Sequence, residues 1–182
     1  MEKLKQSTIL ITGIMAAGKS TIAQALAERL PESVHLRGDV FRRMIVNGQA
    51  KIEAPVSEEA MAQLRLRYQI AALAADAYCD AGFTVVYQDV IIGKILREVV
   101  EMHRKHLLYV VVLCPSSDVA LKRDESRHKQ VYDSWTPDML DNALRTETPR
   151  IGLWLDTSAL TIEETVSSIL NRLDEATISG AI

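Results

Sequence analysis

Cysteine is scarce in this chain of 182 residues, and its scarcity limits what the protein can be. The two cysteines, Cys79 and Cys114, are too few for a disulfide framework or for a zinc site with four cysteine ligands. We therefore expect two reduced, buried thiols, as in a cytoplasmic protein.

Positive charge and long apolar runs are lacking too. The net charge is −3 and the pI is about 5.8, whereas proteins that bind duplex nucleic acid usually have a strongly basic face. No apolar run reaches the roughly 18 residues that a membrane-spanning helix needs. Gly13 interrupts the run 9–17, which argues against a secretory signal. We expect a soluble protein whose partners include neither nucleic acid nor membrane; the sequence leaves the oligomeric state open.

Strand-like and helix-like patterns alternate along the chain. This alternation predicts an α/β fold with a parallel sheet in a single domain, residues 1–182. The expected strands are 8–12, 34–36, 84–87, 107–114 and 153–155, and the expected helices are 19–30, 39–47, 57–80 and 161–176. Ser57 is expected to cap the helix 57–80, and Thr161 and Glu164 form a capping box at the start of the last helix. The polar stretch 122–136 is the expected lid, and the region 40–81 is expected to bind an acceptor.

The segment GIMAAGKS, residues 13–20, matches the phosphate-binding pattern G-x-x-x-x-G-K-[ST] in full. It stands between an expected strand and an expected helix, as such a loop must. Backbone N–H groups of the loop and the positive end of the helix would bind phosphates, Lys19 would reach the β- and γ-phosphates, and the Ser20 hydroxyl would bind Mg²⁺. The expected nucleotide-binding residues are Gly13, Met15, Ala16, Ala17, Gly18, Lys19, Ser20 and Thr21.

Two acids follow expected strands. Asp39 and Asp89 should therefore both lie at the edge of the sheet where ligands bind. Phosphoryl transfer needs a carboxylate to orient the acceptor hydroxyl and take its proton, so we assign Asp39 as the base and Asp89 as a partner of the metal or of the acceptor. The alternative interpretation is structural: Asp39 caps a helix and Asp89 stands in a turn.

Several arginines are candidates for binding anions. Arg123 and Arg127 are four residues apart on a helix that leads into the expected lid, where they would neutralise charge on the transferred phosphoryl group. Arg42 and Arg43 follow Asp39 and would bind an anionic part of the acceptor. In each case a solvated surface charge is the alternative. Weaker candidates are Arg65, Arg67, Arg145 and Arg150.

The chain resembles the chloramphenicol phosphotransferase-like group of small P-loop kinases. The likeness rests on GIMAAGKSTIAQAL, RGDVFRRM around Asp39, VVYQDVIIG around Asp89 and WLDTSALT at 154–161, together with ALKRDESR in the expected lid. It implies a three-layer P-loop fold like that of nucleotide and shikimate kinases, with a five-stranded parallel sheet and a helical lid. It also implies ATP as donor, Asp39 as catalytic base, and Lys19 and Ser20 at the phosphates and the metal. Gln88 stands where the family often has a first acid before Asp89.

These observations favour a kinase that transfers the γ-phosphoryl group of MgATP to a hydroxyl of a small molecule, an antibiotic among the candidates. A nucleoside or nucleotide kinase and a regulatory ATP-binding switch without an acceptor are the alternatives. No complete Asn/Thr-Lys-x-Asp guanine motif occurs, which favours ATP over GTP. Two sets of residues near the expected site favour different acceptors. The arginines would suit an anion, whereas an apolar group would be sheltered by Phe41, Met44, Ile91 and Ile92.

Overall fold

The structure is a computed structural model that describes residues 4–125 and 136–178. Its centre is a five-stranded, wholly parallel sheet with the spatial order β2-β3-β1-β4-β5. This confirms the predicted fold class. The strands are β1 (Ser7–Gly13), β2 (Ser33–Arg37), β3 (Thr84–Gln88), β4 (Leu107–Leu113) and β5 (Leu153–Leu155).

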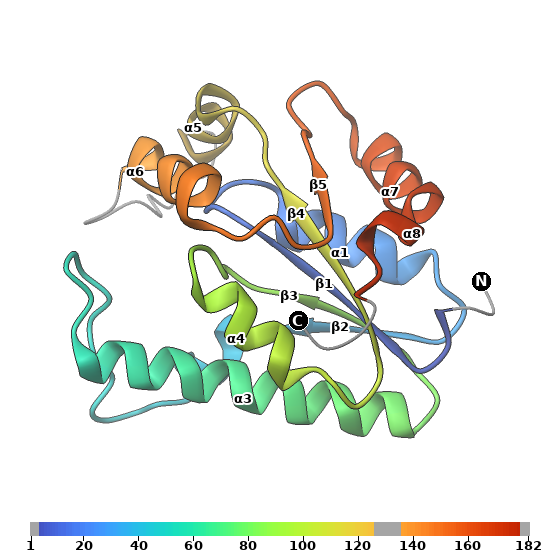
Figure 1. Cartoon of the computed structure of the whole chain (residues 1–182), viewed down its shortest axis with the longest axis horizontal. Helices are drawn as coiled ribbons and strands as arrows, with labels where there is room; N and C mark the ends of the chain where they lie inside the picture. Colours follow the sequence, from blue (N-terminus) through green and yellow to red (C-terminus); the bar gives the residue numbers. More distant parts are fainter. Residues whose placement is uncertain (1–3, 126–135, 179–182) are drawn as a thin grey trace.

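Helices cover both faces of the sheet and make the fold three-layered. Figure 1 shows α3 and α4 on one face and α1, α7 and α8 on the other. The helices are α1 (Lys19–Glu28), α2 (Asp39–Arg43), α3 (Glu58–Asp80), α4 (Ile95–Met102), α5 (Ser117–Glu125), α6 (Pro137–Asn142), α7 (Ile162–Asn171) and α8 (Leu173–Ala176), with a π-helical turn at Ala143–Glu147. Among the described residues, no helix is both long and apolar enough to cross a bilayer.

The two central strands form the core. Residues 9–11 of β1 and 110–113 of β4 have no exposed surface, because helices cover both faces of the sheet. Each such aliphatic side chain contributes about 1.5–3 kcal/mol by burial. The carboxyl ends of these strands are therefore held rigidly at one edge, and the loops that carry the predicted site begin there.

The long helix α3 has a sequence suited to its place. The Ser57 hydroxyl caps it by accepting a hydrogen bond from the Ala60 amide, as predicted. Its buried face is mostly small, with Ala71, Ala75 and Cys79, and so α3 can approach the sheet closely. On its outer side, the Arg65 guanidinium binds Glu98 of α4 at 2.9 Å.

Some elements differ from the predictions. The predicted helix 39–47 ends at Arg43, because the chain turns back and the Gln49 side chain donates to the Arg42 carbonyl at 2.8 Å. The last predicted helix is split at Arg172, whose backbone (φ −119°, ψ 25°) leaves the helical region. The helices α4 and α6 had no predicted counterpart. Most of the predicted lid, including Arg127, lies outside the described residues.

Gly152, just before β5, should be the most sensitive glycine outside the site. Its φ is +71°, and a Cβ added there would lie 2.2 Å from the Val110 carbonyl oxygen. We expect Gly152→Ala to lower the free energy of unfolding by about 3 kcal/mol, through backbone strain and a clash with β4. Gly48→Ala is the matched control, since Gly48 has φ +77° with open space around it. Only the backbone cost of about 1 kcal/mol applies there. Equal losses in urea denaturation would show that the contact with β4 is unimportant.

Buried His103 should make the fold sensitive to acid. Its ring lies 5.5 Å from the Tyr87 ring, and neither ring nitrogen has a hydrogen-bond partner among the described residues. Burial lowers the pKa of His103 from 6.5 to about 4. The unfolded chain therefore binds the proton more tightly, and stability is lost as the pH falls from about 6.5 to about 4. We expect His103→Phe to remove about 2–3 kcal/mol of the loss between pH 7 and pH 4. A His106→Gln chain should keep that loss; a His103→Phe chain with the wild-type pH dependence of urea denaturation would contradict the assignment.

Candidate functional site

The phosphate-binding loop lies between β1 and α1, as its motif predicts. Gly13 has φ +141°, and a Cβ added there would lie 2.3 Å from the Leu113 carbonyl oxygen, so only glycine fits beside β4. Ala16 has φ +58°, which is unusual for a residue with a side chain. Such strain is typical of binding loops, where it turns backbone N–H groups toward a ligand.

The first turn of α1 supplies the positive part of this loop. Gly18 at the N-cap provides no side-chain cap, and the first turn contains no acid, so the N-terminal N–H groups have no local carboxylate beside them. Lys19 is buried, and its ammonium donates to the Ile14 carbonyl across the loop at 2.7 Å. Ser20 and Thr21 are exposed at the start of the helix. This arrangement suits an anion with several oxygens.

Arg123 of α5 extends over this loop. Its Nη1 lies 3.9 Å from the position that a Cβ on Gly18 would take, and its Nη2 donates to the Thr157 carbonyl at 2.9 Å. The guanidinium group thus joins α5 and the segment after β5 to the phosphate-binding loop. Figure 1 shows α5 at the end of the sheet toward which β1 and β4 run.

Asp39 begins α2, directly after β2 and Gly38. Its Oδ2 accepts a hydrogen bond from Arg43 at 2.6 Å, and Arg37 lies 4.0 Å from its Oδ1. Oδ1 is shielded from solvent and accepts no hydrogen bond from the described residues. Arg43 therefore holds one carboxylate oxygen, and the other is buried near Arg37 without a hydrogen-bond donor among the described residues.

Asp89 differs from Asp39, because both of its carboxylate oxygens accept hydrogen bonds. Its Oδ1 accepts hydrogen bonds from Arg67 and from the Val90 amide, each at 2.7 Å. Its Oδ2 accepts one from the Tyr87 hydroxyl at 3.2 Å. Burial raises the pKa of Asp89 even with the Arg67 guanidinium beside it, and the charge of Lys19 is close enough to act in the opposite direction.

The groups around Asp89 respond to the same buried environment. Burial acts to lower the pKa of Arg67, but the Asp89 charge, with Tyr68 and Tyr87, outweighs it and raises the pKa. Burial and the Asp89 charge raise the pKa of Tyr68 to about 12 and raise that of Tyr87 as well. All of these groups therefore keep a fixed ionisation near neutral pH, as suits a structural network.

Gly38 connects the two acids. A Cβ at Gly38 would lie 2.0 Å from Asp89 Oδ2 and 2.9 Å from the Tyr87 ring, although its φ of −65° suits any residue. The start of α2 is thus packed directly on the buried carboxylate. This packing sets the place of Asp39, the next residue.

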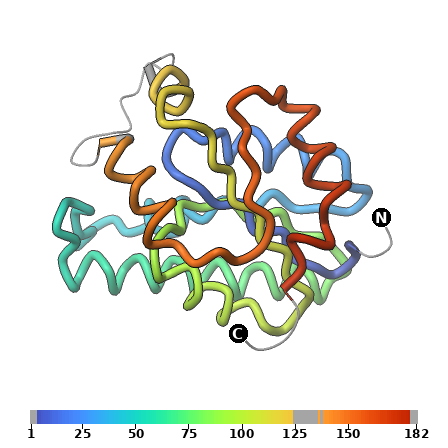
Figure 2. The backbone as a smooth tube through the Cα atoms, turned by 45° about the horizontal axis from the view of Figure 1, so that its top comes forward, coloured from blue at the N-terminus to red at the C-terminus, as the bar shows by residue number. Residues whose placement is uncertain are grey.

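Arg42 anchors the segment after α2. Its guanidinium donates to the Ala50 carbonyl, and the Gln63 side chain of α3 accepts from the Ala50 amide at 2.9 Å and donates to the Gly48 carbonyl at 2.7 Å. Burial first, and the nearby charge of Arg67 second, lower the pKa of Arg42. Figure 2 shows segment 44–57 (teal) beside the N-terminal end of α3.

The remaining arginine candidates have structural partners. Arg65 binds Glu98, Arg145 binds Asp141 at 2.8 Å, and Arg150 stacks 4.0 Å over the Trp154 ring. Arg67 is the site residue that sequence reasoning ranked too low, and Gly38 and Tyr87 were missed. The signal for Arg67 was available, since it lies on the buried stripe of α3 with Ala60 and Ala71.

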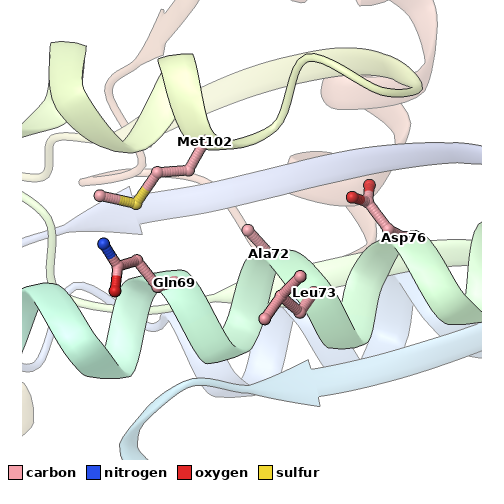
Figure 3. Close-up of a pocket in the computed structure, with 5 residues that line it drawn as sticks. All are labelled: Gln69, Ala72, Leu73, Asp76 and Met102. Carbon is pink, nitrogen blue, oxygen red and sulfur yellow. The ribbon is translucent and has the colours of Figure 1, made fainter.

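A separate hollow of about 320 Å³ lies on the surface between α3 and α4. Figure 3 shows its lining, which comprises Gln69, Ala72, Leu73, Asp76 and Met102. It contains neither a residue of the phosphate-binding loop nor a strand-end acid. The candidate site is therefore the edge of the sheet from which both the phosphate-binding loop and the segment with Asp39 begin.

The comparisons with known proteins agree with this architecture. A sugar kinase from Janibacter sp. HTCC2649 is similar in structure over 93% of this chain and 95% of its own (TM-score 0.70, 19% identity). The Mycobacterium tuberculosis APS kinase CysC in complex with AMPPNP and APS is similar over 92% of this chain and 97% of its own (TM-score 0.70, 18% identity). The Deinococcus radiodurans tunicamycin resistance protein is similar over 96% of this chain and 99% of its own (TM-score 0.67, 18% identity).

At these identities the solved structures show a shared fold. No curated protein sequence matches the chain. The family model AAA_33, described as "AAA domain", matches residues 9–143, from β1 through α6. Because this match spans more than half of the 182 residues, the chain belongs to the AAA domain family.

Proposed function

We propose that the protein is a phosphotransferase that moves the γ-phosphoryl group of MgATP to a hydroxyl of a small molecule, with Asp39 as general base. One observation carries the proposal: Asp39 has one oxygen fixed by Arg43 and the other without a hydrogen bond from the described residues, at the same sheet edge as the phosphate-binding loop. A general base must be able to take up the acceptor proton, and a carboxylate oxygen without a competing hydrogen bond keeps that capacity.

The donor side is supported by the loop. Gly13 to Thr21 would surround the phosphates, with Met15, Ala16, Ala17 and Gly18 supplying backbone contacts and Lys19 its charge. The complex of the similar APS kinase with AMPPNP fits a nucleotide here. The absence of a guanine motif from the sequence favours ATP.

Mg²⁺ would arrive with the phosphates. Among the described residues, no group of three or more acids, histidines or cysteines could hold a metal. This fits Mg²⁺, which is commonly bound by few protein groups together with substrate phosphates and water. The exposed Ser20 hydroxyl is available as a ligand. Asp89 was also predicted as a metal or acceptor ligand, but its hydrogen bonds to Arg67, Val90 and Tyr87 favour a positioning role.

The proposed step moves one proton and one phosphoryl group. The acceptor hydroxyl gives its proton to the Asp39 carboxylate, its oxygen forms a bond to the γ-phosphorus, and the bond from that phosphorus to the β,γ-bridging oxygen breaks to leave ADP. Lys19 and Arg123, which flank the loop, would neutralise the charge that develops on the transferred group. Arg127 has the same predicted role and lies outside the described residues.

The identity of the acceptor would define the specific reaction. The names of the similar structures include a sugar kinase and a tunicamycin resistance protein, and the sequence resembles chloramphenicol phosphotransferase-like kinases. A hydroxylated antibiotic and a sugar derivative are therefore both in the proposed range. A nucleoside or nucleotide kinase is the second candidate, favoured by the arginines around Asp39.

The Asp39→Asn chain tests the proposed base. We expect it to bind ATP as the wild type does and to lose at least about 100-fold in kcat, because the amide cannot accept the proton. Product formation from MgATP would be read by mass spectrometry against hydroxylated antibiotics, sugar acids, sugars, nucleosides and nucleotides. Asp174→Asn, at an exposed residue of α8, is the matched control and should keep its activity. Activity within tenfold of wild type in Asp39→Asn would exclude Asp39 as base; ATP binding without any transfer would favour the regulatory switch.

Gly38→Ala tests how Asp39 is placed. The added methyl group would overlap the Asp89 carboxylate and move either that group or the start of α2. Because a displacement of about 1 Å can cost about 100-fold in rate, we expect kcat to fall by at least about tenfold while the KM for ATP stays within about threefold. Steady-state kinetics and thermal unfolding would be measured together. A folded Gly38→Ala chain with wild-type kcat would show that this packing does not position the base.

A further inference from the structure

The acceptor side of the site carries an excess of positive charge. Among the described residues, the ion pairs of Arg37, Arg43 and Arg67 involve two carboxylates, those of Asp39 and Asp89, and Arg42 adds a further positive charge, in a chain whose net charge is −3. The chain thus concentrates cations here against its overall balance. Such an excess favours binding of an anion.

Arg67 is buried and Arg42 is partly buried. Arg67 is 9% exposed and has Asp89 as its one ionic partner, whereas Arg42 is bonded to the neutral Ala50 carbonyl. The Nε atoms of both are buried and donate no hydrogen bond to the described residues. A buried donor without a partner is costly, typically about 1–3 kcal/mol and more for a charged group, unless a ligand satisfies it.

The environment of Arg42 is consistent with an unneutralised charge. Burial and the positive charge of Arg67 both disfavour its protonated form, as its lowered pKa indicates. The contacts of Gln63 with Gly48 and Ala50 hold the backbone that Arg42 binds. An anion in contact with both guanidinium groups would offset their mutual repulsion.

The apolar alternative loses two of its four residues. Ile91 is completely buried in the core, Phe41 packs against that core, and Met44 is 64% exposed. Of the four apolar residues expected to shelter a neutral group, Ile92 and Phe41 remain as partly buried candidates. The structure therefore favours the cationic interpretation of the acceptor side over the apolar one.

We propose that the acceptor carries an anionic group, a carboxylate or a phosphate, in addition to the hydroxyl that is phosphorylated, and that Arg42 and Arg67 bind this group. The proposal rests on the proposed function and adds the class of acceptor. Neutral hydroxylated molecules, chloramphenicol among them, should then be poor acceptors.

Matched pairs of acceptors that differ by one anionic group test the class. The pairs are gluconate with sorbitol, glycerate with glycerol, and adenosine 5′-monophosphate with adenosine, with chloramphenicol as a further neutral molecule. We expect transfer to an anionic member with kcat/KM at least about tenfold above that of its neutral partner. The pair that reacts distinguishes a carboxylate from a phosphate. A neutral molecule phosphorylated as well as or better than every anionic one overturns the proposal.

Variants of the two arginines test the site itself. Arg42→Met should lower kcat/KM for the anionic acceptor by roughly 10- to 100-fold, mainly through KM, and leave the KM for ATP within about threefold. Arg65→Met is the matched control, because Arg65 is on the same helix as Arg67 but binds Glu98 on the outer side. Arg67→Met would be included only if its thermal unfolding shows a folded chain. Equal kcat/KM in the wild type and Arg42→Met would overturn the assignment.

A binding measurement separates this proposal from the proposed function. With MgAMPPNP filling the nucleotide site, inorganic phosphate should raise the Tm of the wild type and of Arg65→Met, and raise that of Arg42→Met by less than half as much. An equal rise in all three chains would mean that no anion site exists at Arg42 and would overturn the proposal. If no acceptor reacts but phosphate raises the Tm less in Arg42→Met than in the wild type, the phosphotransferase proposal fails while the anion site stands.

Discussion

The ion pair between Arg67 and Asp89 is the contact on which the candidate site depends. It joins the middle of α3 to the end of β3 at 2.7 Å, and both side chains are almost wholly buried. Breaking a buried pair by removing one partner costs about 3–5 kcal/mol, because the remaining charge stays buried without its counter-ion. The Tyr87 hydroxyl and the Val90 amide satisfy the remaining carboxylate positions, which is what makes such a pair tolerable in the interior.

The same network connects the sheet to the phosphate-binding loop. The Asp89 amide donates to the Ile11 carbonyl of β1 at 3.2 Å, and the Thr12 hydroxyl exchanges hydrogen bonds with the backbone of Ile91. The ends of β1 and β3 are thus tied together just before the loop begins at Gly13. Gly38 packs on the Asp89 carboxylate from the other side. The phosphate-binding loop follows β1 and the candidate base follows β2, and these two strands are not adjacent. Their positions relative to each other are fixed through β3, which lies between them.

Local patterns predicted the parts of this structure that depend on neighbouring residues. The loop motif, the Ser57 cap and the Thr161 capping box each need only a few consecutive positions, and the structure contains all three. The role of Arg67 depends on Asp89, 22 positions away, and Arg65, two positions earlier, looks equivalent by sequence. Two residues along a helix is a rotation of about 200°, so only one of these arginines can face the sheet. The buried stripe of α3 identifies Arg67 as the arginine that faces the sheet. This inference requires that a charged residue on a buried stripe is expected to have an ionic partner.

The two strand-end acids show how one residue type supports two different tasks. Asp89 is buried, with both oxygens accepting hydrogen bonds, and such a carboxylate is suited to fixing its neighbours. Asp39 is partly exposed, and its Oδ1 accepts no hydrogen bond from the described residues, so a proton can be taken up there without breaking such a contact. The difference follows from the counter-ions: buried Arg67 belongs to a helix packed on the sheet, whereas Arg43 is an exposed residue of the same short helix as Asp39. If Asp39 is the base, the rigidity that it needs comes from Asp89 through Gly38, and the acceptor can then approach Asp39 without disturbing the pair that holds it in place.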